Sequence, residues 1–269
     1  MCKLIKAEFF KLRKSIYYKA IVLGTILYAL MDIYTYFAGL YRPSNGVKEL
    51  FHSFLFWQRC LLLCGILAGV FIGGDFDNRM LHAQLAVGNG RRNIFAVKAF
   101  VYWIACIGIV LVYQSVDIIG MTCLFGFGTK ITFYELMLLV RTEIAFLIIF
   151  SGFISVCILT AFVFKALFTV TATEIVWIMF GSVIFQNLAN LNSVFNCLYN
   201  YSIFGGITAF TLPLYMYGDG IRSLESVSVE EIFEILAVQS YAKLVVISLV
   251  TVLVATLLSY YAFKKTELK

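Results

Sequence analysis

The sequence predicts an all-α polytopic membrane protein with six transmembrane helices, and three observations support this fold class. Hydrophobic residues make up 62% of the 269 residues, only 13% are charged, and just 2 are prolines, which lies far outside the composition of soluble domains. Most of the chain falls into apolar stretches of about 20 residues, the length that a helix needs to cross a bilayer. The alternating segments typical of barrel strands are absent, so backbone amides in hydrocarbon must find their partners within helices.

An amphipathic helix is expected first, over residues 1–19. On a helical wheel its apolar side chains gather on one side and its lysines on the other. We expect this segment to lie flat on the cytoplasmic leaflet and to lead directly into the first span, either as a general basic anchor or as a dedicated mechanical elbow. The residues predicted to hold it at the membrane surface are Ile5, Phe9, Lys11, Leu12, Lys14 and Ile16.

The transmembrane domain is expected to occupy residues 20–269. Its six predicted spans are 20–40, 54–74, 97–120, 138–164, 168–190 and 241–263. With this arrangement, most of the 21 Lys and Arg residues fall on the side of the amino terminus. Because basic residues collect on the cytoplasmic side of a membrane, both termini are predicted to be cytoplasmic.

The segment 75–96, between the second and third spans, is too long for a tight turn and too polar for the membrane. Acidic residues at its start and Gly88 near its end predict a short cytoplasmic helix followed by a basic turn. A charged helix held between two spans would make a lever for a soluble partner. The candidate coupling residues are Asp75, Asp77, Asn78, Arg79, Gln84, Gly88, Arg91 and Arg92.

Residues 191–240, before the last span, form the least regular region. Residues 196–217 are apolar enough for a seventh span, but Gly205, Gly206 and Pro213 would interrupt it. A re-entrant pair of short helices fits the same hydrophobicity and keeps both termini on one side, so we expect that arrangement, with a seventh span as the alternative.

A capping-box pattern starting at Ser228 predicts a short amphipathic helix on the outer surface. Its acidic face would either attract a cationic peptide by long-range electrostatics or simply be solvated. The acidic residues of this region are Glu225, Glu230, Glu231 and Glu234.

Several ionisable residues lie inside the predicted spans, where a charge is costly without a partner or a function. Arg59 is expected to pair with Asp32 or Asp117, as a structural pair rather than a substrate site. Glu174 lies near the cytoplasmic start of the fifth span, so we expect it to snorkel to water, with an ion-coupling site as the alternative. The full set is Asp32, Arg59, Asp117, Arg141, Glu143 and Glu174.

Other function classes are disfavoured by the residue inventory. The chain has no Gly-x-x-x-x-Gly-Lys-Ser/Thr motif, so it is not expected to hydrolyse ATP itself. Its only histidines, His52 and His82, lie outside the spans, and no Gly-x-Ser-x-Gly motif occurs, which argues against an enzyme. The 7 cysteines show no metal-ligand spacing, and the net charge of +6 is explained by membrane orientation, so neither a metal site nor nucleic-acid binding is expected.

Two sequence patterns resemble one transporter family. Lys6-Ala-Glu8-Phe9-x-Lys11-x-x-Lys14-Ser15, before the first span, resembles the elbow helix of type-2 ABC exporter permeases. Asn78-Arg79 and Gly88-x-Gly90-Arg91-Arg92-x-Ile94, ahead of Lys98, resemble the coupling loop of the same permeases. Six spans, an inside amino terminus and a broken segment before the last span extend the resemblance over the whole chain. Within that family, the chain resembles small bacterial permeases for bacitracin or lantibiotic self-protection.

The resemblance implies a permease subunit of an ATP-driven transporter in a bacterial cell membrane. Its substrate would be hydrophobic or amphipathic, such as a peptide antibiotic, and would be exported or extracted from the membrane. The loop 75–96 would dock on separate ABC ATPase subunits, which would bind ATP and Mg²⁺, and Asp75 or Asp77 would match the family's acidic residue. A second permease chain, identical or related, would complete the substrate path. An ion-coupled secondary transporter is the alternative, although the two halves of the chain show no visible similarity.

Overall fold

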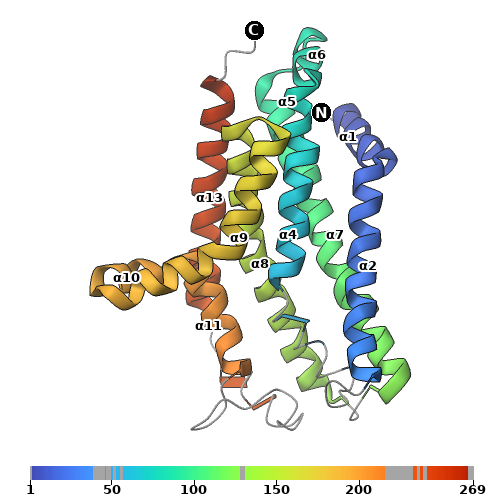
Figure 1. The fold of residues 1–269 in the computed structure, drawn as a ribbon, viewed down its shortest axis with the longest axis vertical. Coiled ribbons are helices and arrows are strands. Elements are labelled where there is room, and N and C mark those ends of the chain that lie inside the picture. Colours follow the sequence, from blue (N-terminus) through green and yellow to red (C-terminus); the bar gives the residue numbers. More distant parts are fainter. Residues whose placement is uncertain are drawn as a thin grey trace.

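The computed structural model describes residues 2–38, 57–127, 131–215 and 241–265, together with residues 46, 50, 53–54, 233–234 and 237–238. These residues are helical or lie in turns and short connections, and none of them is in a β-strand. The long helices pack side by side into an elongated bundle (Figure 1). The all-α prediction is therefore confirmed for the described part of the chain.

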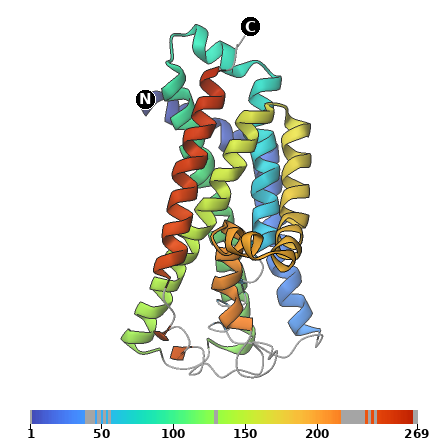
Figure 2. The same ribbon diagram turned by 90° about the vertical axis from the view of Figure 1, so that its left-hand side faces the viewer.

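The first half of the chain contains two long crossings and several short helices at one end. Its elements are α1 (Cys2–Lys14), α2 (Ile16–Phe37), α4 (Trp57–Ala68), the π-helical turn η1 (Gly69–Gly73), α5 (Gly74–Asp77) and α6 (Met80–Ala86). The second half contains α7 (Arg91–Phe125), α8 (Phe133–Phe164), α9 (Leu167–Leu191), α10 (Ser193–Asn200), α11 (Ile203–Tyr215) and α13 (Ala242–Lys265). Helices α1, α5 and α6 and the last turn of α13 lie at the same end of the bundle (Figures 1 and 2).

Five helical segments of the described chain are long and apolar enough to cross a membrane, and the two arms of the bent α9 make a sixth when they are counted together. Helices α7 and α8 extend beyond the predicted spans 97–120 and 138–164. With 35 and 32 residues, they are about 50 Å long, which exceeds a hydrocarbon core of about 30 Å. The extra turns at the start of α8 are stabilised by a capping box between Thr132 and Glu135.

The helix is interrupted at Ser15, between α1 and α2. The Ser15 hydroxyl accepts a hydrogen bond from the Tyr18 backbone N–H at 3.4 Å, which is the role of a helix N-cap. Helix α1 therefore turns away from α2 and lies across the end of the bundle (Figure 1). Ile16 consequently belongs to α2 and is 73% exposed, so the single helical wheel that grouped it with Phe9 and Leu12 was wrong.

A line of glycines lets α9 approach the α4–η1 segment closely. Gly65, Gly69 and Gly73 recur every fourth residue, and a Cβ at Gly73 would lie 3.0 Å from the Leu167 Cα atom. A Cβ at Gly69 would likewise lie 2.9 Å from the Leu167 carbonyl oxygen. Small residues at this spacing allow two helix backbones to pack tightly where lipid provides no hydrophobic driving force.

Helix α9 is not straight over the span predicted for residues 168–190. It bends by 46° between the arms Leu167–Gly181 and Val183–Leu191, and α10 packs back against it. The bent arm and α10 project from the side of the bundle, and α11 then continues toward the opposite end (Figures 1 and 2). The Leu167–Gly181 arm and α11 are each about 20 Å long by helical rise, too short to cross the hydrocarbon core alone.

Helix α11 includes Gly205, Gly206 and Pro213, the residues that we expected to interrupt a helix in region 196–217. Its start is fixed by Phe204, whose ring lies 4.8 Å from that of Trp177 and 5.5 Å from that of Phe153. The tight turn from α10 requires Gly205, because a Cβ there would collide with the Tyr199 carbonyl oxygen.

Candidate functional site

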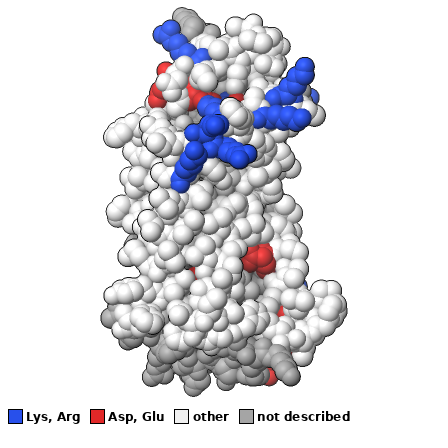
Figure 3. Space-filling view, turned by 90° about the vertical axis from the view of Figure 1, so that its right-hand side faces the viewer, with Lys and Arg blue, Asp and Glu red and all other residues white. Residues whose placement is uncertain are grey.

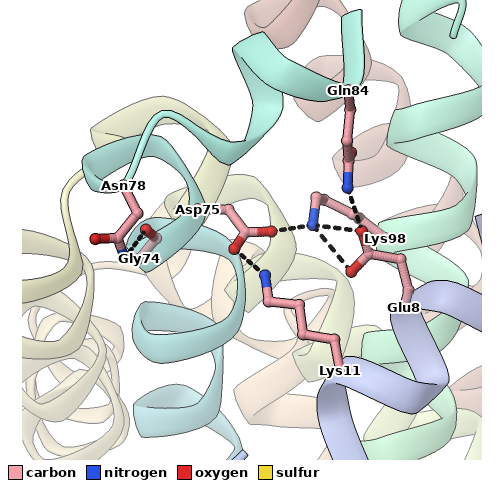
Figure 4. Close-up of polar contacts among 7 residues, drawn as sticks. All are labelled: Glu8, Lys11, Gly74, Asp75, Asn78, Gln84 and Lys98. Atoms are coloured by element: carbon pink, nitrogen blue, oxygen red, sulfur yellow. Dashed lines mark hydrogen bonds and ion pairs between the residues drawn. The ribbon is translucent and has the colours of Figure 1, made fainter. Parts of the chain in front are cut away.

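A buried cluster of charges joins the short helices at one end of the bundle (Figure 4). We call it the ion cluster, and it consists of Glu8, Lys11, Asp75 and Lys98, with Gln84 attached. These side chains come from four helices, α1, α5, α6 and α7. Ion pairs and hydrogen bonds therefore link helices that are far apart in the sequence.

Lys98 is the centre of the ion cluster. Its side chain has 0% exposure, and its ammonium donates to the two Glu8 carboxylate oxygens at 3.1 and 3.2 Å and to the Asp75 carboxylate. Lys11 donates to the other Asp75 oxygen, and Gln84 Nε2 donates to Glu8 at 2.6 Å. The Phe71 ring lies 5.2 Å from the Lys98 ammonium. Two cations and two anions therefore balance, and three of them are buried while the Lys11 side chain is 34% exposed.

The ion cluster changes the roles expected for two residues. Lys11 was expected to meet lipid head groups, but its ammonium is bonded to Asp75. Asp75 was expected on the accessible coupling loop, but its side chain is only 4% exposed and faces Lys98. Glu8 and Lys98 were not among the predicted site residues. Their signal in the sequence is that each charge lies beside apolar residues on its helix face, where it requires a partner.

The other membrane-surface residues divide into buried and exposed groups. Leu12 is 4% exposed, and Ile5 and Phe9 are half-buried against the core. Lys14 is exposed, and its ammonium lies 5.8 Å from the Phe10 ring centroid. The apolar face of α1 therefore packs partly on the bundle itself.

Helix α6 exposes an apolar stripe at the extreme end of the bundle. Met80 is 44% exposed, Val87 is 83% exposed, and Ala83 between them is also exposed. These positions share one face of the chain as it turns through α6. Leu81, on the opposite face, is fully buried. We call Met80, Ala83 and Val87 the α6 stripe.

The ends of α6 are fixed by local backbone conformations. Arg79, exposed beside the α6 stripe, has a positive φ of 54°. Gly88, with φ of 89°, donates its N–H to the Leu85 carbonyl at 2.9 Å and ends the helix, as predicted.

The rest of the loop is bonded to two other helices, α9 and α13. Asp77 accepts a hydrogen bond from the Leu167 backbone N–H at 2.8 Å, at the start of α9. Asn78 Nδ2 donates to the Gly74 carbonyl at 2.8 Å, and Arg91 donates to the Lys264 carbonyl of α13 at 3.1 Å. Arg92 is exposed. These bonds attach the loop to the second half of the chain.

Charged residues toward the other end of the bundle, away from the ion cluster, also have partners. Arg59 Nη1 lies 2.6 Å from both Asp32 carboxylate oxygens, and the Tyr113 hydroxyl donates to Asp32 at 2.7 Å. Of the two expected partners, Asp32 is therefore bonded to Arg59. Asp117 is fully buried nearby in α7.

The remaining intramembrane charges lie on α8 and α9. Gln114 Nε2 lies 3.4 Å from a Glu143 oxygen, and the Arg141 guanidinium lies 5.4 Å from the Tyr241 ring centroid. Glu174 has 0% exposure and accepts hydrogen bonds from Thr160 and, at 3.3 Å, from Cys157 Sγ. The expectation that Glu174 snorkels to water was therefore wrong, because its side chain points between α9 and α8.

The predicted outer acidic helix is mostly outside the described residues. Glu225, Glu230 and Glu231 lie there, whereas Glu234 is described and exposed. Its acidic face stays a prediction. Among the residues that the structure describes, no group of three or more His, Cys, Asp or Glu side chains is placed to hold a metal ion.

No protein-family model matches this chain, and no curated protein is significantly similar to it. Its function is therefore argued from the geometry of the ion cluster and the α6 stripe, together with the sequence patterns.

Proposed function

We propose that this chain is the membrane-spanning permease subunit of an ATP-driven transporter, worked by a separate ABC ATPase that docks on the α6 stripe. The observation that carries the proposal is the α6 stripe itself. Its apolar side chains are exposed, and α6 lies at the end of the bundle, beyond the long helices (Figure 2). Exposed apolar side chains that share one face are typical of a protein interface.

The ion cluster supports a role in transmitting force. Helix α6 has only 7 residues, too few to be stable without tertiary contacts. Its Gln84 is bonded to Glu8 of α1, and Glu8 is bonded to Lys98 of α7. A push on the α6 stripe would therefore move α1 and α7 together rather than deform the loop.

Links to α9 and α13 would carry the same movement to the second half. Asp77 holds the first residue of α9, and Arg91 holds the end of α13. Because interfaces in packed bundles switch between discrete arrangements rather than deform continuously, a docked ATPase would tilt whole helices.

The substrate class and assembly follow from the resemblance to type-2 ABC exporter permeases. The substrate would be a hydrophobic or amphipathic molecule, such as a lantibiotic or a bacitracin-like peptide. ATP and Mg²⁺ would bind in the ATPase, and a second permease chain would complete the path in a bacterial cell membrane. Both termini would be cytoplasmic, since α1 and α6 lie at the ATPase-facing end.

The test is reconstitution of the chain in lipid nanodiscs with candidate ATP-binding cassette proteins from the same organism. We expect a stable complex whose ATP turnover rises with the transported peptide. Met80→Asp with Val87→Asp should weaken the complex at least tenfold, because each charge would have to be desolvated in the interface. Ala7→Asp, at an exposed position on α1, is the control and should bind as the unchanged protein does. Unaltered affinity of the Met80 and Val87 variant would refute docking on the α6 stripe.

An ion-coupled secondary transporter is a second candidate because of Glu174. This carboxyl is fully buried and accepts hydrogen bonds from the neutral side chains of Thr160 and Cys157. Buried carboxyls at membrane depth often serve as proton relays. Peptide flux driven by a pH difference without nucleotide, and abolished by Glu174→Gln, would favour this candidate over the ATP-driven one.

A further inference from the structure

A groove on the surface between α1, α2 and α7 indicates a second binding site. It arises because the break at Ser15 makes α1 and α2 diverge where both lie against α7. Its volume is about 610 Å³, within the range of about 300–1,000 Å³ of small-molecule sites. Most of its lining is apolar, including Leu12 of α1, Ile26 of α2 and Ala105 of α7.

The groove is open because Gly108 lacks a side chain. A Cβ on Gly108 would meet only the Tyr18 hydroxyl, at 3.9 Å. A larger residue at this position would therefore enter the groove without first colliding with the backbone of another helix.

Two cations lie in the lining of the same groove. Arg13 and Lys19 are both exposed, and neither side chain forms a hydrogen bond or ion pair with another described residue. They flank the break at Ser15, at the basic end of the molecule. Their charges are therefore available to an anion from outside the chain.

The cations and the apolar wall follow one another along the axis of α2. From Lys19 the lining continues along α2 through Val22 to Ile26, a distance of about 10 Å by helical rise. On the face that carries α1 and α2, Lys and Arg gather near one end, and the middle of this face carries few charges (Figure 3). An occupant must therefore have an anionic head at the interface and an apolar tail directed toward the bilayer centre.

We propose that this groove binds one anionic phospholipid. The phosphate would contact Arg13 and Lys19, and an acyl chain would lie along α2 and α7 over Gly108. The inference does not depend on the proposed transport function. Its consequence is mechanical, because Glu8 and Lys11 of the ion cluster are on α1, and a lipid held under α1 would fix the helix that carries them.

The experiment measures lipids that remain with the full-length chain. The protein is incorporated into liposomes of equal parts phosphatidylglycerol and phosphatidylcholine, extracted in mild detergent and analysed by quantitative mass spectrometry. We expect about one retained phosphatidylglycerol per chain, in excess over phosphatidylcholine. Removing both cations by Arg13→Gln and Lys19→Gln should lower this excess at least fivefold, since each basic residue near a membrane contributes about fivefold in binding to anionic lipid.

Matched variants distinguish lipid binding in the groove from a general attraction of anionic lipids to basic residues. Lys3→Gln with Lys6→Gln removes the same charge from exposed positions of α1 outside the groove and should leave the lipid ratio unchanged. Gly108→Leu should expel the lipid, whereas Gly24→Leu, at a glycine of α2 with open space around it, should not. Leu23→Trp fills the groove from an exposed position and gives the same test should Gly108→Leu fail to fold.

Three results would overturn the proposal. The first is equal retention of both lipids by the unchanged protein. The second is an equal loss of selectivity in the Lys3 and Lys6 variant. The third is full lipid retention by a folded Gly108→Leu or Leu23→Trp protein.

Discussion

Replacing Lys98 by methionine should destabilise the protein more than any single change at its exposed charges. The substitution keeps the length and apolar stem of the side chain but removes the cation that faces Glu8 and Asp75. The ion cluster would change from two cations and two anions to one cation and two anions. A buried carboxylate without its partner is the costly species in such sites.

The magnitude can be worked from the Lys98–Glu8 distance of 3.1 Å. At an effective dielectric constant of about 20, this attraction is about 5 kcal/mol. Breaking a buried pair by removing one partner costs roughly 3–5 kcal/mol in practice. We therefore expect Lys98→Met to lower the midpoint of thermal unfolding by roughly 6–20 °C, using about 2–4 °C per kcal/mol.

The assay is thermal unfolding of the detergent-solubilised chain, followed by loss of the monodisperse peak in gel filtration. Lys98→Met is compared with Glu8→Gln and with the double variant, which leaves the Lys11–Asp75 pair balanced. The double variant should recover much of the stability lost in Lys98→Met, because it no longer buries an unpaired charge. Lys14→Met, at an exposed cation of α1, is the control.

The reasoning is refuted if Lys98→Met shifts the unfolding midpoint by less than about 2 °C, which corresponds to less than about 1 kcal/mol. It is equally refuted if the losses of stability caused by Lys98→Met and Glu8→Gln simply add in the double variant. Additive losses would mean that Lys98 and Glu8 do not interact.

Three further predictions concern other parts of the fold, and unfolding midpoints test each of them. Gly88→Ala should cost about 1 kcal/mol because of the positive φ of 89°. Gly24→Ala, inside helix α2 with open space around it, should not destabilise the protein, since alanine favours a helix interior; equal losses would contradict the backbone argument. Gly69→Ala should cost roughly 1–3 kcal/mol, since the added Cβ would lie 2.9 Å from a backbone oxygen of α9, and an unchanged midpoint would show that α9 is not packed so closely. Asp32→Asn should cost roughly 1.5–3 kcal/mol through its weakened bond to Arg59, and a more stable protein would rule out a structural pair.

Some functional residues were predictable because their signals are local. Gly88 ends α6 through a backbone conformation that glycine adopts readily, so its position after a short helix was sufficient. The charge of Asp32 at membrane depth likewise required a cation, and Arg59 was one of few available. The end of α6 could be predicted from a few neighbouring residues, and the Asp32–Arg59 pair from the rule that a charge in lipid requires a partner.

The ion cluster could not be predicted in the same way. Glu8 and Lys98 are 90 residues apart in sequence, and nothing in either segment specifies the other as its partner. The expectation for Lys11 was wrong because a helical wheel gives the side of a helix but not what lies against it. Once α1 lies against α7, the Lys11 ammonium reaches the Asp75 carboxylate.

By itself, the sequence determined that the chain is helical, that it is apolar enough for a membrane, and approximately where each long helix lies. Those properties depend on composition and on hydrophobic stretches of about 20 residues, which are local quantities. The tertiary structure alone decided the bend of α9, the burial of Asp75 and Glu174, and the groove beneath α1. These features depend on which helices become neighbours, and pairing across long sequence separations is fixed by packing and charge balance in the folded bundle.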